Sequence, residues 1–544
     1  MHNAPILSFF SDPFSLGRSA FCLKRRHGDY QHLSLREVGN LREPVVVSEA
    51  FVLVGELRAG GRTLVPKILD IDDALRLLSG RAKDDGGEKL WSSKRALEPH
   101  FSSPAEFKRW SEVYEGRGSF PLGEERLRLL ESAADALEKL WRDVQDRLQL
   151  QGEYERFEQI EWPTQQLLHY RQLRGLPFSA EARNACLEAA RNEKYTAYRA
   201  ISEALGVSAS GLNYRNVGQY LSKTDASHLS VFSDNAALPD YMKLARSTSD
   251  FAASFVSYME ASRDVRTLSQ LEDQFGRVFP RFHVVGTVTG RILVSDPHLQ
   301  QLKRRHRSCL VADEGKVLSY IDYAQFEPGI IAALANDDEF LAAYNGGDLY
   351  SNLSIAIFGD ADHRKECKQA FLAFCYGMSR PNIARLLSGT RPGTARYNAT
   401  LQNLDLFFGR YPGLDAFKVR LVQKLAAEGF VASVWGNRRY RTAVGPLVAK
   451  ERRWAISQVI QGTASLIFKE ALLELAAEFG SDAVLLPMHD AVLLQFPVAQ
   501  KGDDTRRASE IMQACFERRF PQVSVRVTSG EFAEKVADML PAEN

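Results

Sequence analysis

The sequence predicts an α+β fold, because helical and strand-forming patterns occupy separate stretches of the chain. Apolar residues recur at three- and four-residue spacing from about residue 124, as in "EERLRLLESAADALEKLWRDVQDRLQLQ", and helical character continues to about 270. Strand and turn signals return from about 280 to 345, and a second helical block runs from about 350 to 428. A long helix through 450–479 then leads to two apolar runs that flank Met488-His489-Asp490.

The stretch before residue 125 is mixed in character. Short β-prone runs such as "EPVVVSEAFVLVGEL" precede "ILDIDDALRLLSG", and a polar stretch follows from 80 to 95. This pattern predicts a small α/β domain with a loose connection to the helical region. We find no internal repeat and no low-complexity tract.

The bulk composition narrows the class of protein. A chain of 544 residues with 45% hydrophobic and 25% charged residues is typical of a globular protein with several domains. The net charge of +1 excludes a uniform polycation, although basic runs such as 303–307 and 438–441 occur locally. The six cysteines form no CxxC pair, which disfavours a disulfide framework or a structural zinc site and suits a reducing cytoplasm. We see neither a secretory pattern at the start nor a segment of ~20 apolar residues, so we expect a cytoplasmic protein without a membrane span.

The stretch "KVLSYIDYAQFEPGIIAAL" holds the first candidate site. The apolar run 317–321 predicts a buried strand that is followed by Asp322, and Pro328 fits the first turn of a helix. Glu327 stands just before this proline. Two interpretations remain open from this stretch alone: a catalytic acid at a strand end, or a solvated aspartate with a glutamate that favours the positive end of the helix.

The stretch "AVLLPMHDAVLLQFP" holds a second candidate. Two apolar runs flank Met488-His489-Asp490 and predict a hairpin with Asp490 at its turn. A single aspartate in a turn is usually a turn residue. If the fold brings Asp322 and Asp490 together, however, the pair could hold two divalent ions roughly 3.5–4 Å apart. Mg²⁺ suits such a site, since it accepts a few carboxylates and completes its shell with water and phosphate oxygens, and Mn²⁺ is an alternative.

The stretch "RKECKQAFLAFCYGM" holds the third candidate. Arg364, Lys368, Leu372 and Tyr376 are four residues apart and would form one stripe along a helix that Gly377 could end. Two cations one turn apart can bind a triphosphate, arginine as a planar fork and lysine as a point charge. A solvated cationic face is the alternative, and it is the commoner one for such stripes.

These three stretches occur in the order and at the spacing found in family A DNA polymerases, the bacterial DNA polymerase I family. Three further stretches resemble motifs of the same family: "TVTGRILVSDPHLQQL", "VWGNRRY" and "QVIQGTASLIFKEAL". Together the six collinear matches cover about 280–544 densely, and the helical region from about 125 resembles the family's thumb more loosely.

The resemblance implies a right-hand polymerase fold with five parts. Residues 1–124 would form an α/β, degenerate 3′-5′ exonuclease-like domain, and 125–280 a helical thumb. Residues 281–345 would form the first part of the palm, 346–430 the fingers and 431–544 the second part of the palm. The chain leaves no room for a separate 5′ nuclease domain.

The resemblance also implies roles for single residues. Asp322 and Asp490, with the backbone carbonyl of Tyr323, would bind the metal ions, and Glu327 would crowd the sugar 2′ position so that deoxynucleotides are favoured. Residues that would bind or face the incoming nucleotide are Arg364, Lys368 (which would also take part in catalysis), Leu372, Tyr376, Gln325 and Tyr350. Residues that would contact the primer-template are Arg291, Gln461 and His489 in the minor groove, with Arg438 and Arg453 on the same DNA-facing surface.

The sequence departs from the family pattern at several of these positions. Ala491 follows Asp490 where the family has glutamate, and Leu372 stands where an aromatic residue is expected. Tyr350 replaces a phosphate-contacting histidine, while Ala324 and Gly329 replace a serine and an arginine of the first motif. We interpret these changes as an altered active site, since both aspartates, Arg364 and Lys368 are present.

The predicted function is therefore template-directed addition of deoxynucleotides to a primer 3′ end. We find no convincing set of nuclease carboxylates between residues 1 and 125, so we expect no proofreading activity. The expected partners are primer-template DNA and deoxynucleoside triphosphates, with no membrane and a monomeric chain. Two alternatives stay open: a single-subunit RNA polymerase-like enzyme, which Glu327 disfavours, and a catalytically weak DNA-binding or scaffold protein derived from a polymerase.

Overall fold

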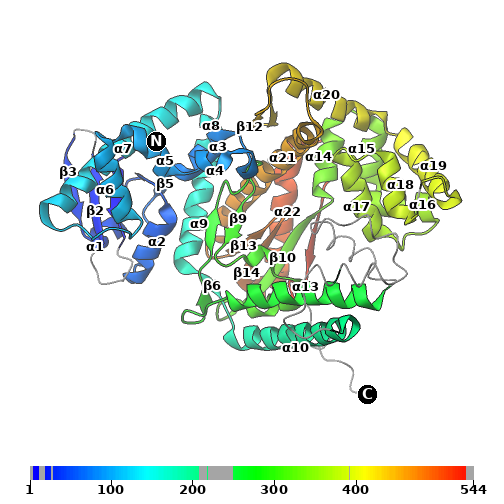
Figure 1. Cartoon of the computed structure of the whole chain (residues 1–544), viewed down its shortest axis with the longest axis horizontal. Coiled ribbons are helices and arrows are strands. Elements are labelled where there is room, and N and C mark those ends of the chain that lie inside the picture. The colour runs from blue at the N-terminus through cyan, green and yellow to red at the C-terminus, as the bar shows by residue number, and fades with distance from the viewer. Residues whose placement is uncertain are drawn as a thin grey trace. The chain divides into compact units, whose positions relative to one another are not determined.

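The computed structural model describes residues 4–11, 19–25, 28–206, 217, 249–390 and 392–533, without the side chains of 88 and 89. Contacts divide the chain into two compact units (Figure 1). Unit 1 comprises Met1–Gly175, Arg281–Ser295 and Gly315–Gly530, and unit 2 comprises Leu176–Pro280, Asp296–Glu314 and Glu531–Asn544. In the described part of the chain, no helix combines the length and the apolar character that a membrane crossing requires.

Unit 1 begins with a mixed five-stranded sheet of order β3-β2-β1-β4-β5. Strands β1 (Ile6–Phe10), β2 (Ala20–Lys24) and β3 (Tyr30–Leu33) pair antiparallel, whereas β4 (Val45–Val47) and β5 (Ile68–Asp70) extend the sheet in parallel from β1. The helices α1 (Leu35–Gly39), α2 (Ala50–Ala59) and α3 (Ile71–Ser79) connect or follow these strands. One buried cluster gathers Leu7, Phe9 and Val45 with α2, and another gathers Ile6 and Phe10 with α3 and later helices.

The β-prone run at 43–57 forms only one short strand, because its second half is helix α2. Ala50, Leu53, Val54 and Leu57 are the buried residues of α2, and their three- and four-residue spacing fits a helix with one face in the core. The β-prone residues of this run favour a strand throughout. In the structure, burial of one helical face selects a helix for the second half.

A series of helices follows the sheet. The short helices α4 (Gly87–Leu90), α5 (Ser93–Leu97) and α6 (Pro104–Tyr114) precede α7 (Gly123–Leu150), α8 (Tyr154–Arg156) and α9 (Trp162–Arg174). Helix α7 packs on the sheet: the Ser8 hydroxyl donates to the carbonyl of Leu130 at 2.7 Å, and Lys24 pairs with Asp135 and Glu138 at 2.6 Å each. This part of the range assigned to the thumb by resemblance therefore belongs to the same compact unit as the N-terminal sheet.

The second sheet of unit 1 is four-stranded and antiparallel, with order β13-β14-β10-β15. Its strands are β10 (Lys316–Ala324), β13 (Val484–Met488), β14 (Ala491–Pro497) and β15 (Arg526–Gly530). Helices α21 (Ala449–Phe479) and α22 (Lys501–Arg519) pack against it (Figure 1): Phe479 meets Phe496 edge to face, with ring centroids 5.0 Å apart. The predicted hairpin with Asp490 at its turn and the predicted long helix at 450–479 are both confirmed.

The described residues between β10 and β11 form seven helices that lead away from this sheet. They are α14 (Phe326–Leu334), α15 (Asp338–Gly346), α16 (Leu349–Phe358), α17 (Arg364–Cys375), α18 (Arg380–Ser388), α19 (Ala395–Gly409) and α20 (Pro412–Glu428). Stacked rings hold α17 to α19, with Phe374 and Phe408 centroids 3.7 Å apart. The chain then returns through the hairpin of β11 (Phe430–Ser433) and β12 (Gly436–Tyr440), while β8 (Arg281–His283) and β9 (Leu293–Ser295) form a further two-stranded ribbon.

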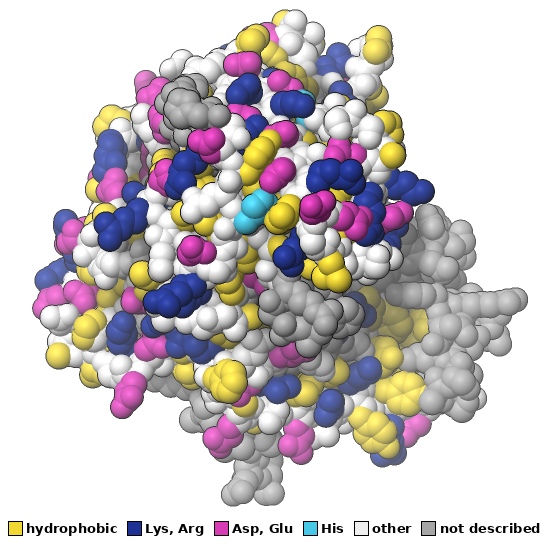
Figure 2. Space-filling model, turned by 90° about the vertical axis from the view of Figure 1, so that its left-hand side faces the viewer, with side chains coloured by type: hydrophobic (Ala, Val, Ile, Leu, Met, Phe, Trp, Pro, Cys, Tyr) yellow, Lys and Arg dark blue, Asp and Glu magenta, His cyan; other side chains and the backbone are white. Residues whose placement is uncertain are grey.

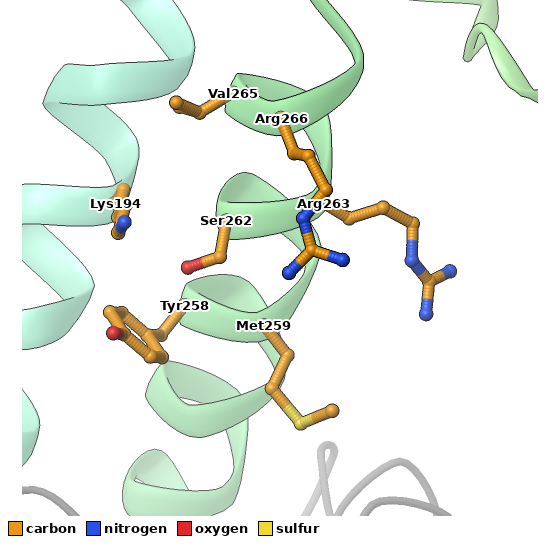
Figure 3. A pocket seen from close by; sticks show the side chains of 7 residues that line it. All are labelled: Lys194, Tyr258, Met259, Ser262, Arg263, Val265 and Arg266. Carbon is orange, nitrogen blue, oxygen red and sulfur yellow. The ribbon is translucent and has the colours of Figure 1, made fainter. Parts of the chain in front are cut away.

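Unit 2 is built on the helix pair α10 (Ala180–Leu205) and α13 (Asp250–Ser269), with a small ribbon of β6 (Leu176–Pro177) and β7 (Arg277–Val278). The pair borders an open hollow of about 540 Å³. Figure 3 shows Tyr258 and Ser262 on the side of α13 that faces Lys194 of α10, whereas Arg263 and Arg266 project away from α10. The stretch "GVSASGLNYRN" predicts an interruption of the helical pattern, and its residues 207–216 lie outside the described residues.

Candidate active site

The register of β10 and β14 brings the two candidate aspartates to neighbouring strand positions. Asp322 lies opposite Ala491, the residue that follows Asp490. The backbone N–H of Tyr323 also donates to the carbonyl of Asp490 at 3.4 Å. Paired Cα atoms in an antiparallel ladder are about 4.5–5.5 Å apart. Both aspartates therefore lie near the same end of the β10–β14 pair. Asp322 and Asp490 are half-buried, and Asp322 lies within β10, two residues before its end.

Tyr323 anchors this strand to the layer beneath it. Its ring is buried and stacks on Phe326 with centroids 4.1 Å apart, and its hydroxyl donates to the carbonyl of Met512 in α22 at 2.5 Å. The side chain is therefore committed to packing, and the part of Tyr323 that borders Asp490 is its backbone.

Four predicted residues from four separate segments meet at one point, which we name the Glu327 cluster: Arg291, Glu327, Tyr376 and Gln461. The carboxylate of Glu327 accepts hydrogen bonds from the Arg291 guanidinium and from the Tyr376 hydroxyl. The amide of Gln461 donates to the same tyrosine oxygen at 3.5 Å. Burial, together with the charge of Glu327 and the hydrogen bond to it, raises the pKa of Tyr376 well above its ordinary value. The tyrosine hydroxyl is thus held protonated, as a donor to the glutamate.

Helix α17 places its two predicted cations beside one buried ring. The Arg364 guanidinium lies 5.4 Å, and the Lys368 ammonium 5.9 Å, from the ring centroid of Tyr350. Arg364 Nε also donates to the Asp348 carboxylate at 2.5 Å. We name these four residues (Asp348, Tyr350, Arg364 and Lys368) the Arg364 stripe. Both cations are exposed to solvent, whereas Tyr350 is 2% exposed, so an aromatic floor lies under two accessible positive charges.

Asp348 has two roles at this place. It is the N-cap of α16, where it accepts from the N–H of Tyr350 at 3.3 Å and from the Ser351 hydroxyl at 2.7 Å. Burial opposes ionisation of Asp348, but hydrogen bonds from Arg364 and Ser351 outweigh it and lower the pKa of Asp348 below its ordinary value. An ionised carboxylate therefore faces Arg364 at neutral pH. The aspartate in "DLYSNLS", two residues before Tyr350, is a typical N-cap residue and could have indicated this helix start.

Gln325 lies at the corner between β10 and α14. It has a left-handed backbone (φ +53°), its side-chain oxygen accepts from the N–H of Leu349 at 3.1 Å, and its carbonyl accepts from the Tyr344 hydroxyl at 3.3 Å. The structure thus uses this predicted nucleotide-binding residue to join the sheet to the start of α16. Leu372 lies half-buried on α17, one turn before Tyr376, which caps that helix ahead of Gly377 (φ +94°).

The remaining predicted DNA-contacting residues occupy separate places. His489 is exposed at the hairpin turn with a left-handed backbone (φ +62°). Arg438 of β12 lies over the ring of Phe430 at 4.8 Å, and Arg453 is exposed on α21 beside Gly377.

Sequence reasoning missed a buried ionic group that is formed by Arg156, Glu161 and Lys469. Glu161 pairs with Arg156 at 2.9 Å and with Lys469 at 2.5 Å, and all three side chains are 0% exposed. The positive charges of Lys469 and Arg156 outweigh burial and lower the pKa of Glu161. Arg156 also donates to the carbonyl of Trp435 at 3.1 Å. One helical turn before Lys469 on α21, Ser465 fixes the loop that carries Arg291, because its hydroxyl donates to the carbonyl of Gly290 at 2.5 Å.

The fold defines the class of protein. An antiparallel sheet with two aspartates on neighbouring strands, and a block of helices inserted after the first of those strands, is the right-hand polymerase architecture. The chain is similar in fold to the POL domain of Pol1 from M. smegmatis, solved in complex with DNA primer-template and dNTP. The TM-score is 0.72 at 19% sequence identity, and the match covers 97% of this chain and 96% of that chain.

Sequence comparison identifies the family. The profile of DNA polymerase family A matches residues 194–532, which is more than half of the chain, and the chain therefore belongs to this family. It is 31% identical over 261 residues to DNA polymerase I of Pseudomonas aeruginosa, which covers 44% of this chain and 28% of that protein. It is 28% identical over 283 residues to the thermostable DNA polymerase I of Thermus thermophilus, covering 48% and 33%. The chain thus spans a third or less of these curated relatives.

Proposed function

We propose that this chain is a template-directed DNA polymerase that adds deoxynucleotides to a primer 3′ end. The observation that carries the proposal is the register that sets Asp322 beside Asp490 on adjacent strands, within the same unit as the Arg364 stripe. Paired carboxylates and exposed cations on one scaffold are what phosphoryl transfer requires, because its catalysis depends on positioning and charge neutralisation.

The donor set at the strand edge fits a hard divalent cation. Asp322 and Asp490 supply carboxylate oxygens, and the backbone of Tyr323 adds a carbonyl oxygen, which are the ligand types that Mg²⁺ and Mn²⁺ prefer. Among the described residues, no group of three or more His, Cys, Asp and Glu side chains could hold a metal, so the remaining ligands would come from water and substrate. A pair of such ions would activate the attacking oxygen and stabilise the leaving phosphate.

The other site residues would bind and select the nucleotide. Arg364 and Lys368 would neutralise the triphosphate, with Leu372 and Tyr376 further along the same helix toward the base. Glu327, fixed by two hydrogen bonds, would leave no space for a ribose 2′-hydroxyl. Arg291, Gln461 and His489 would contact the minor groove of the primer-template, and Arg438 and Arg453 its backbone.

We also propose that residues 1–124, which we name the N-terminal module, lack proofreading activity. Its central strand β1 reads Ile-Leu-Ser-Phe-Phe, and the hydroxyl of Ser8 is used for a hydrogen bond to Leu130 of α7. Metal-dependent nucleases need several carboxylates at one place. The Asp70 carboxylate of this module is used at the start of α3, where it accepts from the N–H groups of Ala50 and Asp72 at 3.0 Å each.

Extension of a labelled primer-template tests the function. Wild type should incorporate dNTPs in the presence of Mg²⁺ or Mn²⁺ and incorporate rNTPs far less, while Asp322→Ala and Asp490→Ala should each lose incorporation but still bind DNA. Asp338→Ala, which removes an exposed carboxylate from α15, is the matched control and should extend normally. DNA binding without extension under either metal would contradict the enzyme and favour a polymerase-derived binding protein; preference for rNTPs would favour an RNA polymerase-like enzyme.

A further inference from the structure

Helix α3 and the turn after it, residues 71–85, contact two segments of the polymerase region that carry proposed DNA-contacting arginines. The first is the segment that leads to Arg291. The Asp73 carboxylate accepts from the backbone N–H of Val285 at 3.0 Å, and Arg76 bonds the ring of His283 at 3.0 Å. These contacts fix the backbone between β8 and Arg291 from the side of the N-terminal module.

The second segment is the β11–β12 hairpin, which carries Arg438. The N–H of Tyr440 donates to the carbonyl of Gly80 at 2.9 Å. Gly80 has a left-handed backbone (φ +54°), and a Cβ atom there would lie 2.4 Å from the Tyr440 ring and 2.7 Å from the carbonyl oxygen of Arg438. Figure 1 shows α3 beside β12. Only a glycine allows this approach of the α3 end to the hairpin backbone.

Ion pairs continue the contact beyond Gly80. Asp85 accepts from Arg439 at 2.9 Å and from Lys450 at 2.6 Å, and Asp84 pairs with Lys450 at 3.0 Å. Arg439 is 8% exposed at its side chain and lies over the Trp454 ring of α21 at 4.5 Å. Hydrogen bonds from Lys450 and Arg439 lower the pKa of Asp85, so this carboxylate is ionised at neutral pH. Arg438 and Arg439 thus point to opposite sides of β12, and Arg439 contacts Asp85 and Trp454 within the protein.

In Figure 2, where the left-hand side of Figure 1 faces the viewer, basic and acidic side chains of the described residues are interspersed without a large patch of one sign. A surface of this kind is an ordinary solvated surface. The distinctive contacts of the module are those that it makes through α3 and residues 80–85 with the polymerase region.

We propose that the N-terminal module acts as an internal brace for DNA binding, in which Asp73 and Asp85 are positioning residues that set the Arg291 loop and the β11–β12 hairpin against the primer-template. This inference rests on the proposed function, since it assigns these segments to DNA contact. The module would make the DNA-binding surface more rigid. Arginines on segments that are already fixed lose less conformational entropy when they bind phosphate or base edges.

The decisive variant is Asp85→Asn, because two explanations predict opposite results. If Asp85 were only a surface charge near DNA, its removal would strengthen DNA binding by reducing repulsion. If Asp85 positions the hairpin, primer-template Kd should rise by about threefold to tenfold, a change of up to about 1.4 kcal/mol. The slope of log K against log salt concentration should fall by about 1 as Arg438 loses its phosphate contact. The KM for dNTP should stay unchanged, since the Arg364 stripe is untouched.

Further variants test whether a general loss of charge, and no specific contact of Asp85, changes DNA binding. Glu43→Gln removes one carboxylate and one exposed ion pair, to Arg25 at 2.7 Å, from the same module without contact to the hairpin, and should leave Kd unchanged. Asp85→Glu keeps the charge and should bind nearly as wild type. Arg439→Leu should weaken binding in the same way as Asp85→Asn, and the double variant should be no weaker than the worse single one.

The outcomes separate the inference from the function on which it rests. Weaker DNA binding by Asp85→Asn with an unchanged melting temperature, dNTP KM and Glu43→Gln control supports the brace. Equal or tighter binding by Asp85→Asn, while wild type extends primers, overturns it. Wild type that neither binds nor extends a primer-template contradicts the proposed function itself.

Discussion

The Glu327 cluster and the Arg364 stripe lie in the same unit, yet they are organised in opposite ways. In the Glu327 cluster, the acid accepts from Arg291 and Tyr376, so its charge is balanced by protein donors in half-buried surroundings. In the Arg364 stripe, two cations are exposed over one ring and a single carboxylate faces one of them. The first arrangement suits a fixed steric wall, and the second suits reception of an anion.

The difference teaches where ligand binding should change the protein. A cluster whose polar groups are already satisfied gains little by moving, and its effect on a substrate is exclusion. In the proposed function, the exposed cations would gain strong hydrogen bonds from a bound triphosphate, and Arg364 would exchange the Asp348 carboxylate for a phosphate. Substitutions in the stripe should therefore change nucleotide affinity and rate, whereas those in the cluster should change selectivity.

The largest effect is expected for Arg364→Ala. Loss of the planar fork should lower kcat/KM for dNTP by about 100- to 1000-fold, the range for removing one strong donor to a reacting anion. Single-nucleotide incorporation under pre-steady-state conditions measures it. Lys365→Ala removes the adjacent exposed cation of α17 and is the matched control. Equal losses in both variants would mean that general positive charge, and no specific fork, binds the nucleotide.

An intermediate effect is expected for Glu327→Ala. Without the carboxylate, the ratio of kcat/KM for dNTP to that for rNTP should fall by about 10- to 200-fold, because a steric and polar barrier to the 2′-hydroxyl disappears. Tyr376→Phe keeps the ring but removes one of the two hydrogen bonds to Glu327, and should lower the ratio less. Competition between matched dNTP and rNTP pairs provides an internal control. An unchanged ratio in Glu327→Ala would place sugar selection elsewhere.

The smallest effect is expected for Asp348→Asn. Asparagine keeps the helix cap but removes the charge that pairs with Arg364, so KM for dNTP should fall by about two- to fivefold, the worth of a partly exposed ion pair. Because the folded-state pKa of Asp348 is lowered, its ion pair is present above the ordinary carboxyl pKa and is lost only as pH falls through the lowered value. The KM difference should therefore persist from pH 9 to about pH 5. Ser351→Ala is the control, and a higher KM in Asp348→Asn would show that the carboxylate orients Arg364 instead of competing for it.

The sequence predicted what depends on local period and order. Four-residue spacing predicted one helix with Arg364, Lys368 and Tyr376, and two apolar runs predicted a hairpin with Asp490 at its turn. Both local structures are confirmed, with Tyr376 as the C-cap of the helix. The family and the α+β fold are confirmed as well. The roles of single site residues and the boundaries of the five domains stay predictions.

The partners of those residues could not be predicted, because they depend on tertiary contacts between distant segments. Asp348 and Arg364 are 16 positions apart across two helices, and Arg291 and Glu327 are 36 apart. Nothing in "ILDIDDALRLLSG" indicates that its helix would contact β12, more than 350 residues later. The helical half of "EPVVVSEAFVLVGEL" shows the converse case, in which a local pattern favours a strand and packing selects a helix.

The corner at Gln325 connects two parts of the candidate site, the strand β10 and the helix α16. Its side chain holds the start of α16 and its carbonyl holds Tyr344, so Asp348 is mechanically attached to the strand that carries Asp322. Arg364 belongs to α17, which begins after the turn at 359–363. The ion pair between Asp348 and Arg364 therefore links α17, through the start of α16, to the strand that carries Asp322.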